Sequence, residues 1–122
     1  MSGIEYVADT NAIIYLLLGK ECMKPFFQKK LSISLITKME LLSFPRITDD
    51  EDAMIREYLK ECDILGVNFD ICERTILLRR NFKIKLPDAI VAATAMTYNA
   101  SLITADTGFY KLDGLEIIKL NP

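Results

Sequence analysis

The sequence predicts an α/β fold with a central, mainly parallel sheet flanked by helices. Short segments with strand character alternate along the chain with segments of helical periodicity, which is typical of a sheet buried between helical layers. The chain has 122 residues and contains no repeats, linkers or low-complexity tracts. We therefore expect a single domain over residues 1–122.

Apolar patterning places the elements, and residues that begin or end helices set their limits. Strands are expected at 5–8, 31–35, 65–69, 101–104 and 116–120. Helices are expected at 10–18, 37–43, 49–61, 70–81 and 87–98. Gly19 and Pro45 end the first two helices, and Thr48 with Glu51 has the spacing of a capping box before the third. Pro87 suits the first position of the last helix.

Two of the helices carry an apolar set that the spacing predicts. In helix 49–61 the face contains Ile55, Leu59 and Cys62, so Cys62 is expected to be a small core residue. In helix 70–81 the apolar members are Ile71, Ile76, Leu77 and Leu78.

The composition excludes several classes of chemistry. The absence of His removes Ser-His-Asp and Cys-His catalysis, His-ligated zinc and imidazole acid–base chemistry. Fifteen Lys and Arg against 17 Asp and Glu give a net charge of −2, so a large basic field for nucleic acid is not expected. The apolar runs are far shorter than the ~20 residues of a membrane span. Three cysteines without a CxxC pair, and no basic leader, indicate a cytoplasmic protein.

Four acidic residues lie at junctions between the expected elements. Asp9 follows the first strand, Glu40 lies in the first turn after the second strand, Asp88 begins the last helix, and Asp106 follows the strand at 101–104. Each has a structural alternative. These alternatives are an N-cap for Asp9, a capping box of Thr37 with Glu40, a helix-dipole partner for Asp88 and a turn for Asp106.

The joint pattern of these acids indicates a metal site. In open α/β sheets the functional crevice lies beyond the carboxyl ends of the strands, and all four acids occupy such positions. Carboxylates that converge repel one another, and a hard divalent cation such as Mg²⁺ relieves the repulsion. Without His or a thiolate pair, oxygen ligation is the convincing option, and such a site suits hydrolysis of a phosphodiester.

Five segments, in order, carry a resemblance to a known family. They are Y-V-A-D-T-N at 6–11, S-L-I-T-K-M-E-L-L at 34–42, K-L-P-D-A-I-V-A-A-T-A at 85–95, L-I-T-A-D-T-G-F at 102–109 and L-D-G-L-E-I-I at 112–118. Over nearly its whole length the chain resembles the PIN-domain ribonucleases, in particular the small VapC-type toxins of toxin–antitoxin pairs. One departure is Ala105, where many relatives carry a basic or polar residue, and this affects substrate contacts more than metal binding.

The resemblance implies a PIN-like domain that cleaves single-stranded RNA with Mg²⁺ or Mn²⁺. It implies one catalytic and metal-binding cluster, formed by Asp9, Glu40, Asp88 and Asp106. It also implies a homodimer and a cognate antitoxin protein as partners. An inhibitor could insert an Arg into the acidic pocket and lie along apolar residues near the first helices. These are Ile13, Ile14, Leu16, Leu17, Phe26 and Phe27, part of which could instead serve the homodimer.

Supporting residues have less specific signals. Thr10, Asn11 and Thr104 could orient water or the ligating carboxylates, but they are equally ordinary cap and strand-end residues. A basic group precedes Asp88 and could collect RNA phosphates, or it could be a solvated helix end. Its members are Arg79, Arg80, Lys83 and Lys85.

Other α/β classes fit the sequence less well. A receiver domain has paired acids after its first strand, but Thr10 follows Asp9, and a haloacid-dehalogenase-type phosphatase needs a second acid where Asn11 stands. A P-loop motif is missing from the sequence. The open alternative is a catalytically silent PIN-like module that binds RNA or a partner protein.

Overall fold

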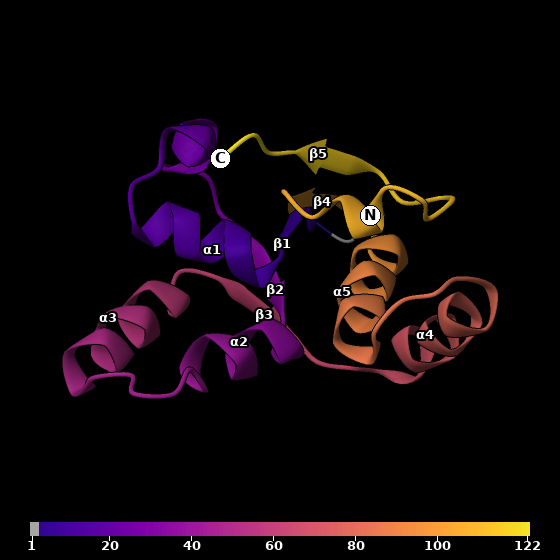
Figure 1. Ribbon diagram of the computed structural model, residues 1–122, viewed down its shortest axis with the longest axis horizontal. Helices are drawn as coiled ribbons and strands as arrows, with labels where there is room; N and C mark the ends of the chain where they lie inside the picture. The colour runs from indigo at the N-terminus through magenta and orange to yellow at the C-terminus, as the bar shows by residue number, and fades with distance from the viewer. Residues whose placement is uncertain (1–2) are drawn as a thin grey trace.

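The computed structural model describes residues 3–122, and its centre is a five-stranded sheet with helices on both faces (Figure 1). The strands are β1 (Tyr6–Ala8), β2 (Ser32–Ser34), β3 (Asp63–Leu65), β4 (Ser101–Thr104) and β5 (Ile117–Lys119). The α-helices are α1 (Thr10–Leu17), α2 (Leu35–Leu42), α3 (Asp49–Leu59), α4 (Phe69–Asn81) and α5 (Leu86–Thr97). Two short 3₁₀ helices complete the described chain, η1 (Glu21–Phe26) and η2 (Thr107–Phe109).

All the strand pairs are parallel, in the order β3-β2-β1-β4-β5, which confirms the predicted α/β class. The chain builds outward from β1 to β3, then returns to the other side of β1 to add β4 and β5. Val7 of β1 pairs with Ser32 on one side and Leu102 on the other. The strand order therefore reverses at β1 and β4, and in open α/β sheets ligands bind beyond the carboxyl ends of the strands at such a point.

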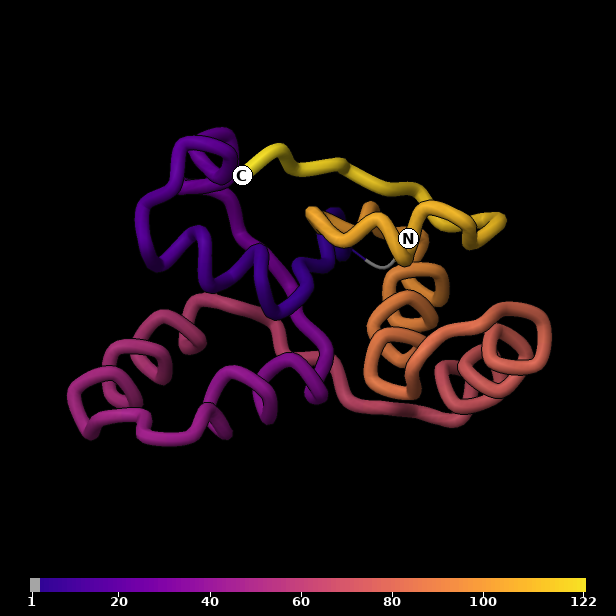
Figure 2. Tube along the Cα trace, viewed as in Figure 1, coloured from indigo at the N-terminus to yellow at the C-terminus, as the bar shows by residue number. Residues whose placement is uncertain are grey.

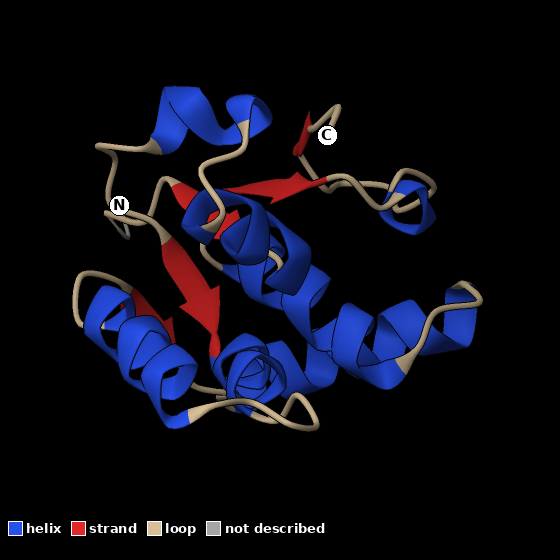
Figure 3. Cartoon of the chain, turned by 60° about the vertical axis from the view of Figure 1, so that its left-hand side comes forward, coloured by secondary structure: helices blue, strands red, loops and turns tan. Residues whose placement is uncertain are grey.

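Two hydrophobic cores lie on opposite faces of the sheet, because successive strand side chains point to opposite faces. Figure 3 shows the helices that cover the sheet. Ala8, Ile33 and Ile103 face α1, η1, α2 and α3. Val7 and Leu102 face α4 and α5. The α5 sequence is rich in buried small residues, which lets this helix lie close to the sheet.

The end of the chain returns to the first core. After β5 the trace runs back beside η1 (Figure 2), and Leu120 packs in the same cluster as Phe26. The segment between α1 and β2 contains the 3₁₀ helix η1, whose buried Met23 and Phe26 anchor it against the core.

Two predicted elements need the largest corrections. The strand expected at 65–69 ends at Leu65, and Phe69 begins α4, because the Asn68 side chain caps that helix by accepting a hydrogen bond from the Ile71 amide at 2.9 Å. The helix expected at 37–43 begins at Leu35, because Ser34 is its N-cap and accepts from the Ile36 amide at 3.2 Å.

The second correction rules out the capping box of Thr37 and Glu40, which was the structural alternative for Glu40. Thr37 lies inside α2 and is fully buried, and within residues 3–122 its hydroxyl has no hydrogen-bond partner. The capping box of Thr48 and Glu51 is confirmed, with both reciprocal bonds formed, at 3.1 and 3.0 Å.

Several burial predictions also change. The buried face of α4 is Ile71, Thr75 and Leu78, whereas Ile76 and Leu77 are 39% and 54% exposed. The spacing of four and three residues selects the first set, and the other two lie on the exposed part of the helix. Cys62 lies beyond the end of α3 but still packs, half-buried, against the first core.

The apolar residues near the first helices are also divided between core and surface. Ile13 and Phe26 are core residues, and Ile14, Leu16 and Leu17 pack partly against that core. Phe27 is 47% exposed. Among the described helices, none is long and apolar enough to cross a membrane.

Candidate active site

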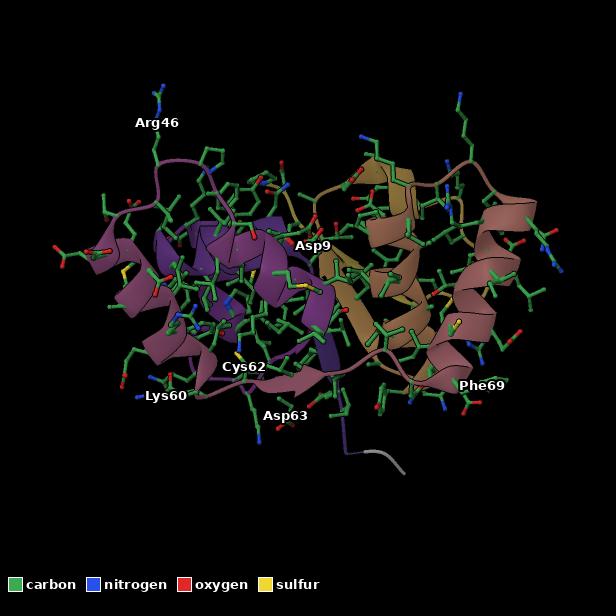
Figure 4. All side chains as sticks on the ribbon, turned by 90° about the horizontal axis from the view of Figure 1, so that it is seen from below. Asp9, Arg46, Lys60, Cys62, Asp63 and Phe69 are labelled. Atoms are coloured by element: carbon green, nitrogen blue, oxygen red, sulfur yellow. The ribbon has the colours of Figure 1, made fainter. Side chains whose placement is uncertain are left out.

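Asp9 is the most buried of the four acids and lies where β1 passes into α1. It is 7% exposed, and its Oδ1 accepts a hydrogen bond from the Ala12 amide at 2.8 Å, so it is the N-cap of α1. Its Oδ2 accepts a hydrogen bond from the Thr104 hydroxyl. Figure 4 shows Asp9 between the purple helices and the orange α5, at the opposite end of the strands from Asp63. The N-cap alternative for Asp9 is therefore correct, and Asp9 also lines the cavity described below.

Thr104 connects two of the acids across the switch point. Its fully buried hydroxyl donates to Asp9 and accepts a hydrogen bond from the Asp106 amide at 2.9 Å. Asp106 in turn accepts from the Gly108 amide through Oδ1, at 2.8 Å, which forms the turn expected from the sequence. The end of β4 thus fixes the backbone position of Asp106 relative to Asp9.

Glu40 reaches the site from the second turn of α2, not from a helix cap. The Thr10 hydroxyl donates to Glu40 Oε1 at 2.6 Å and so ties α2 to the first residue of α1. Asp88 enters from the first turn of α5 and is half-buried. Asn11 is exposed and lies at the same cavity.

A cavity of about 400 Å³ collects all four acids. Its polar lining comes from Asp9, Thr10, Asn11, Glu40, Ser43, Asp88 and Asp106. Its apolar lining comes from Phe44, Pro45, Val91 and Phe109. The structure therefore brings together the four acids, Thr10 and Asn11 at one cavity, with Thr104 buried directly behind Asp9.

The electrostatics show that these carboxylates influence one another. Burial raises the pKa of Asp9, and the nearby charges of Asp106 and Asp88 raise it further, against the lowering effect of its two hydrogen bonds. Burial also raises the pKa of Asp88, as do the charges of Asp106 and Glu40, while the positive charge of Lys85 opposes them. The cavity is a site of like-charge repulsion, which a bound cation would relieve.

The donor set suits a hard divalent cation, because the polar side chains at the cavity present carboxylate, hydroxyl and amide oxygens. Within residues 3–122, no three acidic or cysteine side chains stand close enough together to hold a metal ion by themselves. Mg²⁺ commonly takes only one or two carboxylates and fills its other positions with water and substrate phosphate oxygens. The residues present therefore fit such an ion, with ligands completed from outside the protein.

The predicted basic group divides into two parts. Lys83 and Lys85 line a second cavity of about 250 Å³, which shares Asp88 and Asp106 with the first. Arg79 instead donates to the Ile84 carbonyl at 3.3 Å. Among the described residues, Arg79 and Arg80 line neither of the two cavities.

Lys111 and Phe44 are among the residues beside the acids that sequence reasoning missed. Lys111 lines the second cavity, and no sequence signal marked this isolated lysine after η2. Phe44, 46% exposed, lines the first cavity. Its carbonyl accepts from the Ile47 amide at 3.2 Å across Pro45 and Arg46, whose φ of 66° is that of a type II turn. The turn points Arg46 away from the molecule, as Figure 4 shows. A proline before a tight turn was the available signal.

Comparisons with known proteins give one family. The model of the PIN domain family matches residues 6–115. Among solved structures, a toxin–antitoxin complex from Klebsiella pneumoniae contains a chain 33% identical in sequence, with a TM-score of 0.80, over 94% of this chain and 97% of that one. No curated protein sequence matches the chain closely enough to count as a relative.

More distant structures share the fold alone. VapBC-1 from nontypeable Haemophilus influenzae matches at 24% identity and a TM-score of 0.83, over 95% of this chain and 98% of that one. DNA-bound VapBC from Salmonella typhimurium matches at 19% identity and a TM-score of 0.84, with the same two coverages. The arrangement of strands and helices around the cavity is thus one that solved toxin–antitoxin complexes contain.

Proposed function

The chain belongs to the PIN domain family, and from this premise we propose that it is a metal-dependent endoribonuclease that hydrolyses phosphodiester bonds of single-stranded RNA. The observation that carries the proposal is the cavity shared by four carboxylates at the switch point of the sheet. The catalytic and metal-binding residues are proposed to be Asp9, Glu40, Asp88 and Asp106.

The surrounding residues support these acids by holding their positions. Two hydrogen bonds orient the Asp9 carboxylate, one of them from Thr104, so that it has a single direction into the cavity. Thr10 does the same for Glu40. Asn11, exposed at the rim, offers an amide to substrate or water. Preorganised carboxylates need no rearrangement when substrate arrives.

The cation is proposed to be Mg²⁺ or Mn²⁺, held by carboxylates of this cluster and completed by water and a phosphate oxygen. When bound, it would supply the Lewis acidity that phosphodiester hydrolysis requires. Burial, and after it the repulsion between neighbouring acids, raises the pKa of Asp9 and Asp88, and the repulsion supports this part of the proposal because a cation relieves it.

We further propose that the protein is the VapC-like toxin of a toxin–antitoxin pair, acts in the cytoplasm and forms a homodimer. The 33% identity to a chain of a toxin–antitoxin complex supports the antitoxin as a partner. The three cysteines, Cys22, Cys62 and Cys72, are free, which suits a reducing compartment.

Cleavage of a fluorescent single-stranded RNA by the purified protein tests the proposal. We expect cleavage with Mg²⁺ or Mn²⁺, loss of cleavage in EDTA, and loss in Asp88→Asn and Asp106→Asn. Asp50→Asn is the matched control, because Asp50 is an exposed acid in the first turn of α3, away from both cavities. It should cleave like the wild type.

The outcomes separate the proposal from its alternative. Cleavage that persists in EDTA, or equally in all three variants, would indicate a contaminating nuclease and contradict the metal mechanism. Metal-dependent RNA binding without any cleavage would support the catalytically silent module instead.

A further inference from the structure

Three lysines surround the second cavity, beside the carboxylates. Lys83 and Lys85 come from the segment between α4 and α5, and Lys111 comes from the segment after η2. The cavity has a volume of about 250 Å³ and shares Asp88, Asp106 and Phe109 with the first cavity. The lysines therefore lie around a continuation of the acidic site, in a chain whose net charge is −2.

One hydrogen bond fixes this arrangement. The Lys111 ammonium donates to the Lys83 backbone carbonyl at 2.6 Å, which joins segments 28 positions apart in the sequence. An ammonium group has three N–H donors, so this bond leaves two for a ligand. The backbone carbonyl positions the charge without neutralising it.

The lysines also keep their charge free of carboxylates at close range. In the part of the chain that the structure describes, the ion pairs within 4.0 Å involve Lys24, Lys30, Arg56 and Lys60, and none involves Lys83, Lys85 or Lys111. Burial and the charges of Asp106 and Glu40 raise the pKa of Asp88, and the nearby positive charge of Lys85 opposes this rise. Three cations thus stand next to acids without forming closed ion pairs.

This juxtaposition suits a ligand with more than one negative charge along its length. At the four carboxylates a single phosphate is repelled, and only a bound cation offsets this repulsion. A strand of RNA places further phosphates on either side of the one at the acids, and a cluster of lysines can neutralise one of these. An acidic segment of a protein is the other polyanion that could contact lysines, but it would not use the acids beside them.

We propose that Lys83, Lys85 and Lys111 form a binding site for the backbone phosphate of single-stranded RNA next to the phosphate that lies at the acidic cavity. The proposal deepens the nuclease function and rests on it for the position of the cut. Lys85 and Lys111 contact the phosphate, and Lys83 also holds Lys111 through its carbonyl. Arg79 and Arg80, which the sequence grouped with these lysines, are left out of the site.

The first test measures binding of a short single-stranded RNA in EDTA, where no cleavage occurs, at several salt concentrations. Lys85→Ala and Lys111→Ala should each weaken binding severalfold and reduce the slope of log affinity against log salt by about 0.7, the value for one lost contact to a single strand. Lys29→Ala is the matched control, because Lys29 is an exposed lysine that lines a cavity with Lys30, Ser32 and Asp63 at the amino end of the sheet. Its affinity and slope should stay at wild-type values.

Lys111→Arg distinguishes the loss of a phosphate contact from a structural effect of the substitution. Arginine keeps the charge and an N–H donor for the Lys83 carbonyl, so this variant should recover most of the affinity. Thermal melts of all variants, which should match the wild type, show whether a loss comes from unfolding.

The second test asks which phosphate the lysines contact. An RNA that the wild type cuts at one mapped bond is made with a neutral methylphosphonate at each phosphate adjacent to that bond in turn. One of the two replacements should lower kcat/KM for the wild type but have little further effect on Lys111→Ala, because the same contact is already lost. Additive losses at both positions would overturn the proposal.

The binding and cleavage arms separate this inference from the nuclease function. If the wild type cuts no RNA but the lysine variants lose affinity and salt slope, the nuclease proposal fails and the phosphate site stands. If the wild type cuts RNA and the lysine variants bind and cut equally well, the phosphate site is wrong. Lysine variants that bind RNA normally but lose a protein partner would also overturn it in favour of an acidic protein segment.

Discussion

The Thr104 hydroxyl donates a hydrogen bond to the Asp9 carboxylate, across 95 positions of sequence and from a neighbouring strand of the sheet. The same hydroxyl accepts from the Asp106 amide. One buried side chain thus sets the relative positions of two acids that sequence reasoning could only place at the same edge.

Thr104→Val should destabilise the protein and reduce cleavage together. Valine has the same shape but no hydroxyl, so the buried Asp9 Oδ2 loses a donor and the Asp106 amide loses an acceptor. We expect a loss of about 1–3 kcal/mol in the free energy of unfolding, measured by urea denaturation. Thr104→Ser should recover both stability and cleavage.

Thr48→Ala controls for the effect of stability alone. It removes the capping-box bond to Glu51 at the start of α3 and should cost about 1 kcal/mol while leaving cleavage unchanged. Equal cleavage by Thr104→Val and the wild type would show that the Thr104 bond is structural only.

Glu40→Gln should abolish cleavage with little change in stability. The amide oxygen of glutamine can still accept the 2.6 Å bond from Thr10, so the contact between α1 and α2 is retained. The negative charge is lost, and with it the ability to bind a cation strongly. Rates with Mn²⁺ and urea denaturation measure the two effects. A variant that cleaves normally would remove Glu40 from the site and leave it as a link between helices.

Asp88→Asn should stabilise the protein at neutral pH in the absence of divalent cations. Burial, with the charges of Asp106 and Glu40, raises the pKa of Asp88 in the folded state above its value in the unfolded chain. Between those two values the folded state binds more protons, so the contribution of Asp88 to stability falls as the pH rises and is least favourable above the folded pKa.

The difference between wild type and Asp88→Asn should therefore be largest near pH 7 and disappear below about pH 4, the ordinary range of an aspartate. Denaturation in EDTA across this range measures it. Asp70→Asn is the control for charge at a helix start, because Asp70 is an exposed acid in the first turn of α4. If Asp88→Asn lowered the free energy of unfolding at pH 7 as much as Asp70→Asn does, that result would contradict the argument from repulsion.

A divalent cation should raise the melting temperature of the wild type, because a ligand that binds only the folded state stabilises it by mass action. The rise should grow with Mn²⁺ or Mg²⁺ concentration and should be blunted in Asp88→Asn and Asp106→Asn. Asp50→Asn should respond like the wild type. A melting temperature that no concentration of either metal changes, in any of these proteins, would count against a metal site at the cavity.

The sequence indicated the fold and the edge of the sheet on which the acids lie, but not how they are held. Asp9 and Asp106 each follow a strand, and parallel strands bring such residues to one edge whatever the details of packing. Glu40 was assigned to the same place with an incorrect helix start, because Ser34 rather than Thr37 caps α2. The strand predicted at 65–69 is wrong because the actual strand has only three residues, too few to show a clear alternating pattern beside the cap of α4.

Contacts between distant segments were beyond sequence reasoning. Lys111 and Lys83 meet only because η2 and the segment before α5 are brought to the same cavity. Phe44 reaches the acids through a turn in which Arg46 has a positive φ, a conformation that its residue type does not predict. Periodicity shows which face of an element is buried, whereas a contact such as that of Lys111 with Lys83 depends on tertiary packing.

An antitoxin that inhibits this protein should do so by inserting an arginine into the acidic cavity. A guanidinium group binds carboxylates through two parallel hydrogen bonds and carries the positive charge that the cavity lacks. Glu40 and Asp106 are exposed, so an arginine can reach them from outside. The rest of an inhibitor can contact Phe27 and Leu18, which are 47% and 69% exposed. It cannot contact Ile13, which is buried.

Co-expression with such an antitoxin should therefore yield a tight, inactive complex. Changing the inserted arginine to Ala should restore cleavage by more than it weakens binding, because the apolar contacts remain. Asp88→Asn should weaken binding of the wild-type antitoxin but not of its Arg→Ala variant, whereas Asp50→Asn should affect neither, since only a shared contact couples the two changes. A complex that cleaves RNA at the full rate, or that binds Mn²⁺ as the free protein does, would show that inhibition leaves the acidic cavity open.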